Sequence, residues 1–252
     1  MLAAERRDHL LETLRRDGKI VAKTAAAELG LSEDSIRRDL RELAAEGLCQ
    51  RVYGGALPVS PALADYDGRR RVAVAGKQLV AAAAVRLIDP GSTVILDGGT
   101  TALAIASGLP ADLRCTVITH SPTVAAALVE HPVAEVFVLG GRLFKHSAVA
   151  SGAAAVEAAQ QVSADVFFLG VTGIHPEAGL TTGDADEAAM KRALASRAAE
   201  TYVLGSSEKV GAASPYRVIG FDAVAGVITD ADPGSDVVRR LGEQVRVVEA
   251  GR

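Results

Sequence analysis

Aromatic side chains and long apolar runs are both scarce in this chain of 252 residues. Aromatic residues make up 4% of the sequence and tryptophan is absent, so a core must be built mainly from Ala, Val, Leu and Ile. Such a core is typical of helices packed on a parallel sheet. No apolar run approaches the roughly 20 uncharged residues that span a bilayer, and the N-terminus is charged, unlike a signal peptide. We therefore expect a soluble, cytoplasmic protein with no membrane partner.

Cysteine and net charge are scarce as well. Cys49 and Cys115 are far apart and have no metal-ligand neighbours, which argues against a disulfide framework and a zinc site. The histidines are scattered, so we expect no metal and no cofactor. The net charge of −4 gives no sign of a nucleic-acid partner. Any DNA-binding surface must therefore depend on where the charges lie, not on their sum.

The N-terminal part of the sequence predicts a small helical domain with a wing. Apolar residues recur at helical spacing, glycines end the helices, and a glycine turn at residues 53–55 separates two short β-branched runs. The predicted helices cover residues 4–16, 21–29 and 32–46, and the predicted strands cover residues 48–52 and 56–59. Two helices around a short turn, followed by a hairpin, indicate a winged helix-turn-helix over residues 3–58.

The rest of the chain predicts a larger α/β domain. Residues 59–76 lose apolar periodicity and gather Pro, Asp, Gly and Arg, as a linker would. In residues 77–252, helical stretches alternate with seven short β-branched runs, at 92–96, 115–119, 134–139, 164–170, 201–205, 223–229 and 244–248. This alternation predicts a doubly wound, mostly parallel sheet with helices on both faces.

The helix predicted to begin at Ser32 has the features of a DNA-reading helix. Ile36, Leu40 and Leu43 share one face, which turns inward, and Ser32 can cap the helix start. The opposite face holds arginines that could instead be solvated and paired with Glu33, Asp34 and Glu42. The position on the second helix of the motif, before a wing, favours docking in a major groove of operator DNA. The predicted DNA contacts are Lys23, Thr24, Ser32, Ser35, Arg37, Arg38, Arg41 and Arg51.

A second candidate site lies in a glycine loop between a predicted buried strand and a helix. The loop comprises Asp97, Gly98, Gly99, Thr100 and Thr101. Glycines let a ligand approach the backbone, and the free N–H groups of the following helix favour a phosphate. The alternative is a tight turn in which Thr100 or Thr101 simply caps the helix.

The motifs SEDSIRRDL and YGGA resemble the signature helix and wing of the deoxyribose-operon repressor (DeoR) family. Here Ser35 stands where the family usually has Thr, and Tyr53 where it often has His. The loop at Asp97–Thr101 is similar to the family's phosphate-binding motif. The resemblance covers nearly the whole chain and implies a C-terminal sugar-phosphate sensor domain that resembles ribose-5-phosphate isomerase.

The same resemblance implies roles for three more residues. Lys209 would be a counter-charge for phosphate, although Glu208 beside it departs from the family pattern. Glu187 would contact sugar hydroxyls or a neighbouring helix, or else form a helix salt bridge with Lys191. His120 replaces an amide at a strand end, where it would tune effector choice or cap the next helix.

Two positions argue against isomerase chemistry. Leu169 and Thr172 stand where the resembling isomerase carries acidic residues that transfer protons. We therefore expect no catalytic residues and no enzyme activity.

The sequence as a whole predicts a homo-oligomeric transcriptional regulator, a dimer or tetramer that associates with the nucleoid when bound to DNA. It would repress a carbohydrate catabolic operon until a phosphorylated sugar or related metabolite relieved the repression. The alternatives are an isomerase-like enzyme acting on a sugar phosphate and an activator with the same DNA-binding mode.

Overall fold

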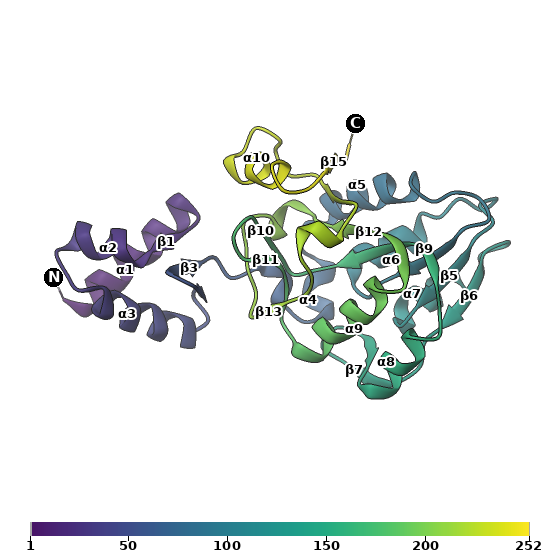
Figure 1. Ribbon diagram of the computed structural model, residues 1–252, viewed down its shortest axis with the longest axis horizontal. Helices are drawn as coiled ribbons and strands as arrows, with labels where there is room; N and C mark the ends of the chain where they lie inside the picture. The colour runs from purple at the N-terminus through teal and green to yellow at the C-terminus, as the bar shows by residue number, and fades with distance from the viewer. Residues whose placement is uncertain (1, 252) are drawn as a thin grey trace.

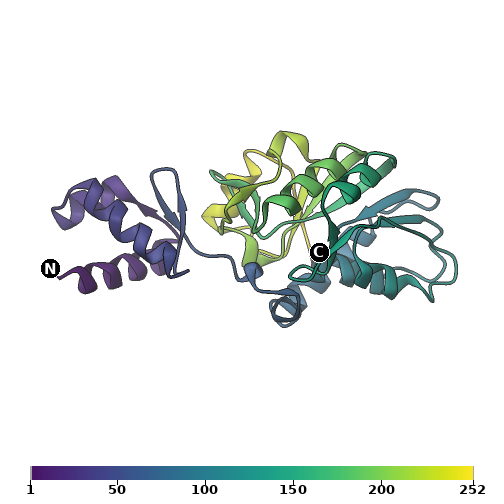
Figure 2. The same ribbon diagram turned by 90° about the horizontal axis from the view of Figure 1, so that it is seen from below.

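The computed structural model describes residues 2–251, which form two lobes joined by a single segment (Figure 1). The smaller lobe, purple and dark blue in Figures 1 and 2, contains helices packed beside a small antiparallel sheet in the order β1-β3-β2. Its elements are α1 (Ala3–Asp17), β1 (Ile20–Val21), α2 (Ala22–Leu29), α3 (Glu33–Ala45), β2 (Gln50–Val52) and β3 (Gly55–Leu57). Except for β1, which is too short to leave a periodic pattern, these are the helices and strands that the sequence predicts.

An apolar core and one buried ion pair hold the smaller lobe together. The predicted stripe of Ile36, Leu40 and Leu43 is fully buried against leucines of α1 and alanines of α2. Arg6 of α1 donates to both carboxylate oxygens of Asp39 on α3, the Nη2 bond measuring 2.8 Å. Asp39 is buried. This ion pair therefore holds α1 against the inward-facing side of α3.

The segment predicted to be a linker is folded against the larger lobe. Residues 59–76 contain the short helices η1 (Pro61–Leu63) and α4 (Tyr66–Arg70), and α5 (Val74–Val85) begins within it rather than at residue 77. The hydroxyl of buried Ser60 donates to the carbonyl of Thr172. Pro61 begins η1 and Asp65 caps the start of α4, so the segment is not a free tether.

The larger lobe is built on a seven-stranded sheet in the order β15-β14-β12-β9-β4-β5-β6, with every neighbouring pair parallel. Each of the seven β-branched runs that the sequence singles out overlaps one of these strands. The strands are β4 (Thr93–Leu96), β5 (Thr116–Thr119), β6 (Glu135–Val138), β9 (Ala164–Gly170), β12 (Ala198–Leu204), β14 (Gly226–Thr229) and β15 (Val247–Glu249). The predicted α/β fold with a parallel sheet is confirmed.

Helices cover both faces of this sheet, as a parallel sheet requires. One apolar core joins the sheet to α5, α6 (Thr100–Ser107) and α7 (Pro122–Leu128). The other core joins it to α8 (Ala153–Ala159), α9 (Ala185–Ala195) and α10 (Asp236–Gly242). Alanine and branched aliphatic side chains fill both cores, and Phe167 and Phe168 on the central strand β9 point to opposite faces.

Short antiparallel strands, which the sequence pattern does not reveal, lie beyond the ends of the main sheet. They are β7 (Arg142–Phe144) with β8 (Val149–Ser151), and β10 (Gly173–His175) with β11 (Gly179–Thr182) and β13 (Tyr216–Arg217), accompanied by the turns η2 (Ser207–Lys209) and η3 (Phe221–Ala223). Strands of two to four residues are too short to show alternation. Within residues 2–251, no helix is both long and apolar enough to cross a membrane.

The order of the strands determines where a ligand can bind. The chain runs outward from β4 to β5 and β6 and then returns to place β9 on the other side of β4. Ligands of open α/β sheets bind at the carboxyl ends of the strands where the order reverses. The carboxyl ends of β4 and β9 therefore mark the expected binding crevice.

Candidate functional site

The arginines of α3 lie on the surface of the smaller lobe. Arg37, Arg38 and Arg41 are exposed and do not pack against the larger lobe. Ser32 caps the helix as predicted, since its Oγ accepts from the backbone N–H of Ser35 at 3.3 Å. The start of α3 therefore presents a serine hydroxyl and a row of cations that a duplex can approach.

The alternative interpretation is that these arginines form surface ion pairs, and one of the three does so. Arg37 donates to Glu33 at 2.9 Å, one turn earlier. Arg38 and Arg41 form no ion pair with any described residue. A solvent-exposed pair contributes on the order of 0.5 kcal/mol, so the Arg37 pair is weak enough for a DNA phosphate to displace.

The other predicted DNA contacts surround α3. Lys23 and Thr24 are exposed in the first turn of α2, and Arg51 is exposed on β2 of the wing. Tyr53 at the tip of the wing is fully exposed. Arg37 of α3, Arg51 and Tyr53 line one pocket between α3 and the wing.

In the larger lobe, a pocket opens at the crevice between the carboxyl ends of β4 and β9. Gly98, Gly99, Thr100 and Thr101 line it after β4, and Gly170 to Thr172 line it after β9. We call it the sensor pocket. Gly99 takes a φ of 108° at the start of α6, and no side chain caps that helix. The tight-turn alternative, in which Thr100 or Thr101 caps α6, is therefore wrong, and the first N–H groups of the helix remain available for an anion.

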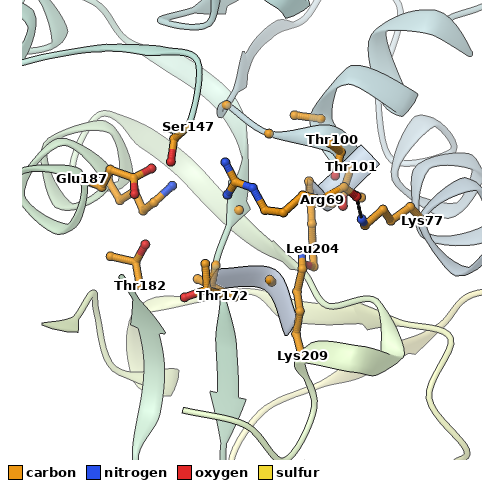
Figure 3. A pocket seen from close by; sticks show the side chains of 17 residues that line it. Arg69, Lys77, Thr100, Thr101, Ser147, Thr172, Thr182, Glu187, Leu204 and Lys209 are labelled. Atoms are coloured by element: carbon orange, nitrogen blue, oxygen red, sulfur yellow. Dashed lines mark hydrogen bonds between the residues drawn. The ribbon is translucent and has the colours of Figure 1, made fainter. Parts of the chain in front are cut away.

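Four cationic side chains line the sensor pocket, those of Arg69, Lys77, Lys191 and Lys209. Figure 3 shows Lys77, Thr100 and Thr101 on one side of the pocket and Glu187, Ser147 and Thr182 on the other. The guanidinium of Arg69 extends between the two sides, and Lys209 lies below it. Within the pocket wall, the Nε of Arg69, the Oγ1 of Thr101 and the Oγ of Ser147 are buried without a hydrogen-bond partner. Buried polar atoms are normally paired, so these atoms indicate a site that a polar ligand completes.

Burial lowers the pKa of three of these cations. It lowers the pKa of Lys209 from 10.5 to about 8, although the nearby Glu208 carboxylate acts in the opposite direction. Burial likewise lowers the pKa values of Arg69 and Lys77. Desolvated cations with few anionic neighbours are high in free energy. An anion in the pocket would restore the lost interactions.

Asp97 lies beneath the sensor pocket, not on its wall. Its carboxylate is fully buried and accepts from the backbone N–H groups of Gly98 and Gly170, each at 2.8 Å, and from Lys191 Nζ at 2.7 Å. Burial alone would raise its pKa, but the Lys191 ammonium and the His120 hydrogen bond hold that pKa well below its usual range. The structure does not bring Asp97 to the wall of the pocket, where the sequence analysis expected ligand contact, because its carboxylate is fully buried and is held by Gly98, Gly170, Lys191 and His120.

His120 is also withdrawn from the pocket. Its Nε2 lies 2.8 Å from Asp97 and its Nδ1 lies 2.9 Å from the carbonyl oxygen of Ala150. These two contacts hold the imidazole ring in place. His120 therefore neither lines the pocket nor caps α7, and it instead joins the Ala150 carbonyl of β8 to the Asp97 carboxylate after β4.

Glu187 does line the sensor pocket, on the side opposite the threonines. The alternative of a helix salt bridge between Glu187 and Lys191 is wrong, because the ammonium of Lys191 is taken by Asp97. Among the lining residues Glu187 carries the one carboxylate. Glu208, by contrast, does not line the pocket, and its Oε1 accepts from Ser206 Oγ at 2.8 Å.

Several residues of this site carry little or no signal in the sequence. Arg69 lies in the segment interpreted as a linker, where the run of three arginines was its one visible signal. Lys77 lies on an alanine-rich helix without a motif, Ser147 lies just before β8, and Thr182 ends β11, and both of these strands are too short to predict. These residues come together only through the fold.

The pocket lacks the acids of an isomerase at the two positions that the sequence identified. Leu169 is fully buried in an apolar core, and the hydroxyl of Thr172 lies 2.7 Å from that of Ser214. Among the described residues, no cluster of His, Cys, Asp and Glu could hold a metal ion. The arrangement can bind an anion with attached hydroxyls, and Glu187 alone offers little for proton transfer between two carbons.

Comparison with known proteins matches both lobes to one family of regulators. Residues 6–62 match the DeoR-like helix-turn-helix domain, and residues 72–231, more than half of the chain, match the DeoR C terminal sensor domain. The HTH-type transcriptional regulator GlpR of Haloferax volcanii is 34% identical over 94% of this chain and 93% of its own length. The glycerol-3-phosphate regulon repressor of Escherichia coli K12 is 27% identical over 96% of each chain.

The larger lobe also has a weak likeness to an isomerase. Ribose 5-phosphate isomerase A of Methanocaldococcus jannaschii aligns with 53% of this chain and 52% of its own, at a TM-score of 0.39 and 18% identity. These values are too low to support an argument about function. The family matches and the regulator relatives confirm instead that the chain is a transcriptional regulator and not an enzyme.

Proposed function

The chain is a DNA-binding transcriptional regulator of the DeoR family, and we propose that it represses a carbohydrate catabolic operon until a phosphorylated sugar or related metabolite fills the sensor pocket. It would act in the cytoplasm, at the nucleoid when bound to DNA. Residues 3–58 would form the DNA-binding domain. The segment 59–76 would work together with the sensor domain that follows.

The exposed arginines of α3 support the DNA-binding part of this proposal. Arg38 and Arg41 have no ionic partner among the described residues, and Arg37 has only a weak surface pair. Arginine can bind guanine through two hydrogen bonds or hold a phosphate. Lys23, Thr24, Ser35 and Arg51 would contact the flanking backbone.

The single observation that carries the effector proposal is the set of unsatisfied polar groups in the sensor pocket. Arg69, Lys77 and Lys209 supply cationic groups, and the N-terminus of α6 adds backbone N–H donors. A phosphate at this end would interact with Gly98 to Thr101 and Lys209. Glu187 and Ser147, across the pocket, would hydrogen-bond the hydroxyls of the attached sugar.

A homo-oligomer explains how ligand binding would reach the DNA. Two copies of α3 must match two half-sites of the operator, so a small change in their separation removes one set of contacts. A ligand that prefers the mismatched arrangement shifts the population toward it. Repression would then be relieved without any change in the reading helix itself.

The experiment begins with selection of bound duplexes from a random DNA pool by the full-length protein. Binding of the selected duplex is then titrated with glycerol 3-phosphate, glucose 6-phosphate, fructose 1-phosphate and inorganic phosphate, with glycerol, glucose and fructose as matched controls. The proposal expects a phosphorylated compound to weaken DNA binding while its unphosphorylated partner has no effect. Tighter DNA binding with the effector would instead support the activator alternative, and indifference to all phosphates would refute the sensor assignment.

A further inference from the structure

The segment between the two lobes forms part of the wall of the sensor pocket. Ala62 of η1 and Arg69 of α4 both line it, although the other cations come from the sheet domain itself. The segment leaves the wing directly at the end of β3. A ligand that contacts Arg69 would therefore contact the same stretch of chain that carries the DNA-binding domain.

Several contacts hold this segment against the sensor domain. Ser60 Oγ donates to the Thr172 carbonyl, and the hydroxyl of Tyr66 donates to Thr123 Oγ1 at 2.9 Å. The ammonium of Lys77 donates to the carbonyls of Arg69 and Val72, each at 2.6 Å. These contacts fix the backbone of the segment at both ends of α4.

The side chain of Arg69 is less well satisfied than its backbone. Its Nη2 donates to the carbonyl of His146 at 3.3 Å, a long bond, and its Nε is buried with no partner. Figure 3 shows the guanidinium reaching across the pocket from the threonine side toward Ser147 and Glu187. A planar guanidinium with a free N–H is suited to bind an anion through two parallel hydrogen bonds.

We infer that Arg69 is an anion-binding residue of the sensor pocket and that, through it, ligand binding is transmitted to the segment that positions the DNA-binding domain. This inference rests on the proposed function and adds the residue that joins its two halves. Arg69 would exchange its long bond to His146 for bonds to the ligand. Because α4 packs against α6, whose N-terminus faces the same pocket, a bound anion would clamp the two helices together.

Matched variants are available on the same helix. Arg69→Gln removes the charge and the fork, Arg69→Lys keeps the charge, and Arg70→Gln makes the same change at the exposed neighbouring arginine. Each full-length protein is examined by hydrogen–deuterium exchange with and without saturating inorganic phosphate. The melting temperature is measured alongside to verify folding and phosphate binding.

In the wild-type protein and in Arg70→Gln, phosphate should slow amide exchange across residues 66–72. Arg69→Gln should bind phosphate at least tenfold more weakly and lose the slowing in this segment, even at concentrations that still protect the start of α6. Arg69→Lys should lie between the two. The same order is expected when phosphorylated effectors release the selected duplex.

The results separate the two claims. If phosphate protects α6 and residues 66–72 equally in the wild-type protein and in Arg69→Gln, the role assigned to Arg69 is wrong while the sensor pocket stands. If phosphate neither raises the melting temperature of the wild-type protein nor slows exchange anywhere in it, the proposed sensor function fails, and the inference fails with it.

Discussion

Replacement of Lys209 by methionine should make the protein more stable and less able to bind an anion. Lys209 is buried, and its ammonium donates to the carbonyl of Leu204 at 3.0 Å. Glu208, the carboxylate that interacts with Lys209, does not line the pocket. Without a ligand, the protein therefore keeps a desolvated cation at a free-energy cost that methionine, of similar length, would remove.

The magnitude follows from the pKa of Lys209. Its fall from 10.5 to about 8 on burial corresponds to about 3 kcal/mol of lost folding free energy for the charged form. Methionine leaves the Leu204 carbonyl unpaired, which costs about 1 kcal/mol. The free energy of unfolding of Lys209→Met should therefore exceed that of the wild-type protein by about 2 kcal/mol near neutral pH.

The pH dependence gives the result its specific signature. The pKa of Lys209 is lower in the folded state than in the unfolded state, so the wild-type penalty is present in full below about pH 8. It is relieved as the pH rises toward the unfolded pKa of 10.5. The stability advantage of Lys209→Met should therefore shrink as the pH is raised from about 7 to about 9.5.

The assay is urea unfolding followed by tyrosine fluorescence in phosphate-free buffer, at both pH values. Lys209→Arg, which keeps its cation throughout this range, is the control and should gain no stability. Phosphate should then stabilise the wild-type protein but not Lys209→Met. A methionine variant less stable than the wild-type protein at neutral pH, or an advantage that does not change with pH, would refute the reasoning.

Three further substitutions test parts of the fold that position the sites. Asp97→Asn should lower the free energy of unfolding by about 3 to 5 kcal/mol in urea titrations, because it leaves the Lys191 cation buried without its partner. A loss well below 1 kcal/mol would mean that this pair contributes little to stability. Asp39→Asn should reduce the melting temperature of the smaller lobe by separating α1 from α3, and an unchanged melting curve would contradict that account. Gly98→Ala would place a Cβ 2.0 Å from Val149 Cγ1, so phosphate should no longer raise the melting temperature of this variant. Adding Val149→Ala should restore the effect of phosphate if this clash is the cause.

The main elements of the fold could be predicted because each has a local pattern. The buried stripe of α3 repeats at helical spacing, and the seven β-branched runs overlap the parallel strands, of which the inner ones are largely buried. The strands β10, β11 and β13 could not be predicted in this way. They are short, and their pairing depends on partners such as Tyr216 that are distant in sequence.

The residues of the two candidate sites also divide into those that the sequence reveals and those that it does not. The glycine loop before α6 and the arginines of α3 are visible because a single short stretch carries each of them. Asp97 belongs to that loop in sequence, yet its side chain turns inward, and only the positions of His120 and Lys191 reveal why. Arg69 could not be predicted because it lies in a segment without periodicity. The pocket around its side chain is built mainly by residues from other parts of the chain.

The most direct test of the central claim is the affinity of Arg38→Ala for the selected duplex, measured by fluorescence anisotropy at a fixed, moderate salt concentration. If α3 enters the groove and Arg38 contacts a base, binding should weaken by about 1 to 3 kcal/mol, and discrimination at one base position should relax. Arg239→Ala, on exposed α10 of the other lobe, should bind as the wild-type protein does. Unchanged affinity and sequence preference in Arg38→Ala would contradict the assignment of Arg38 to the reading face of α3.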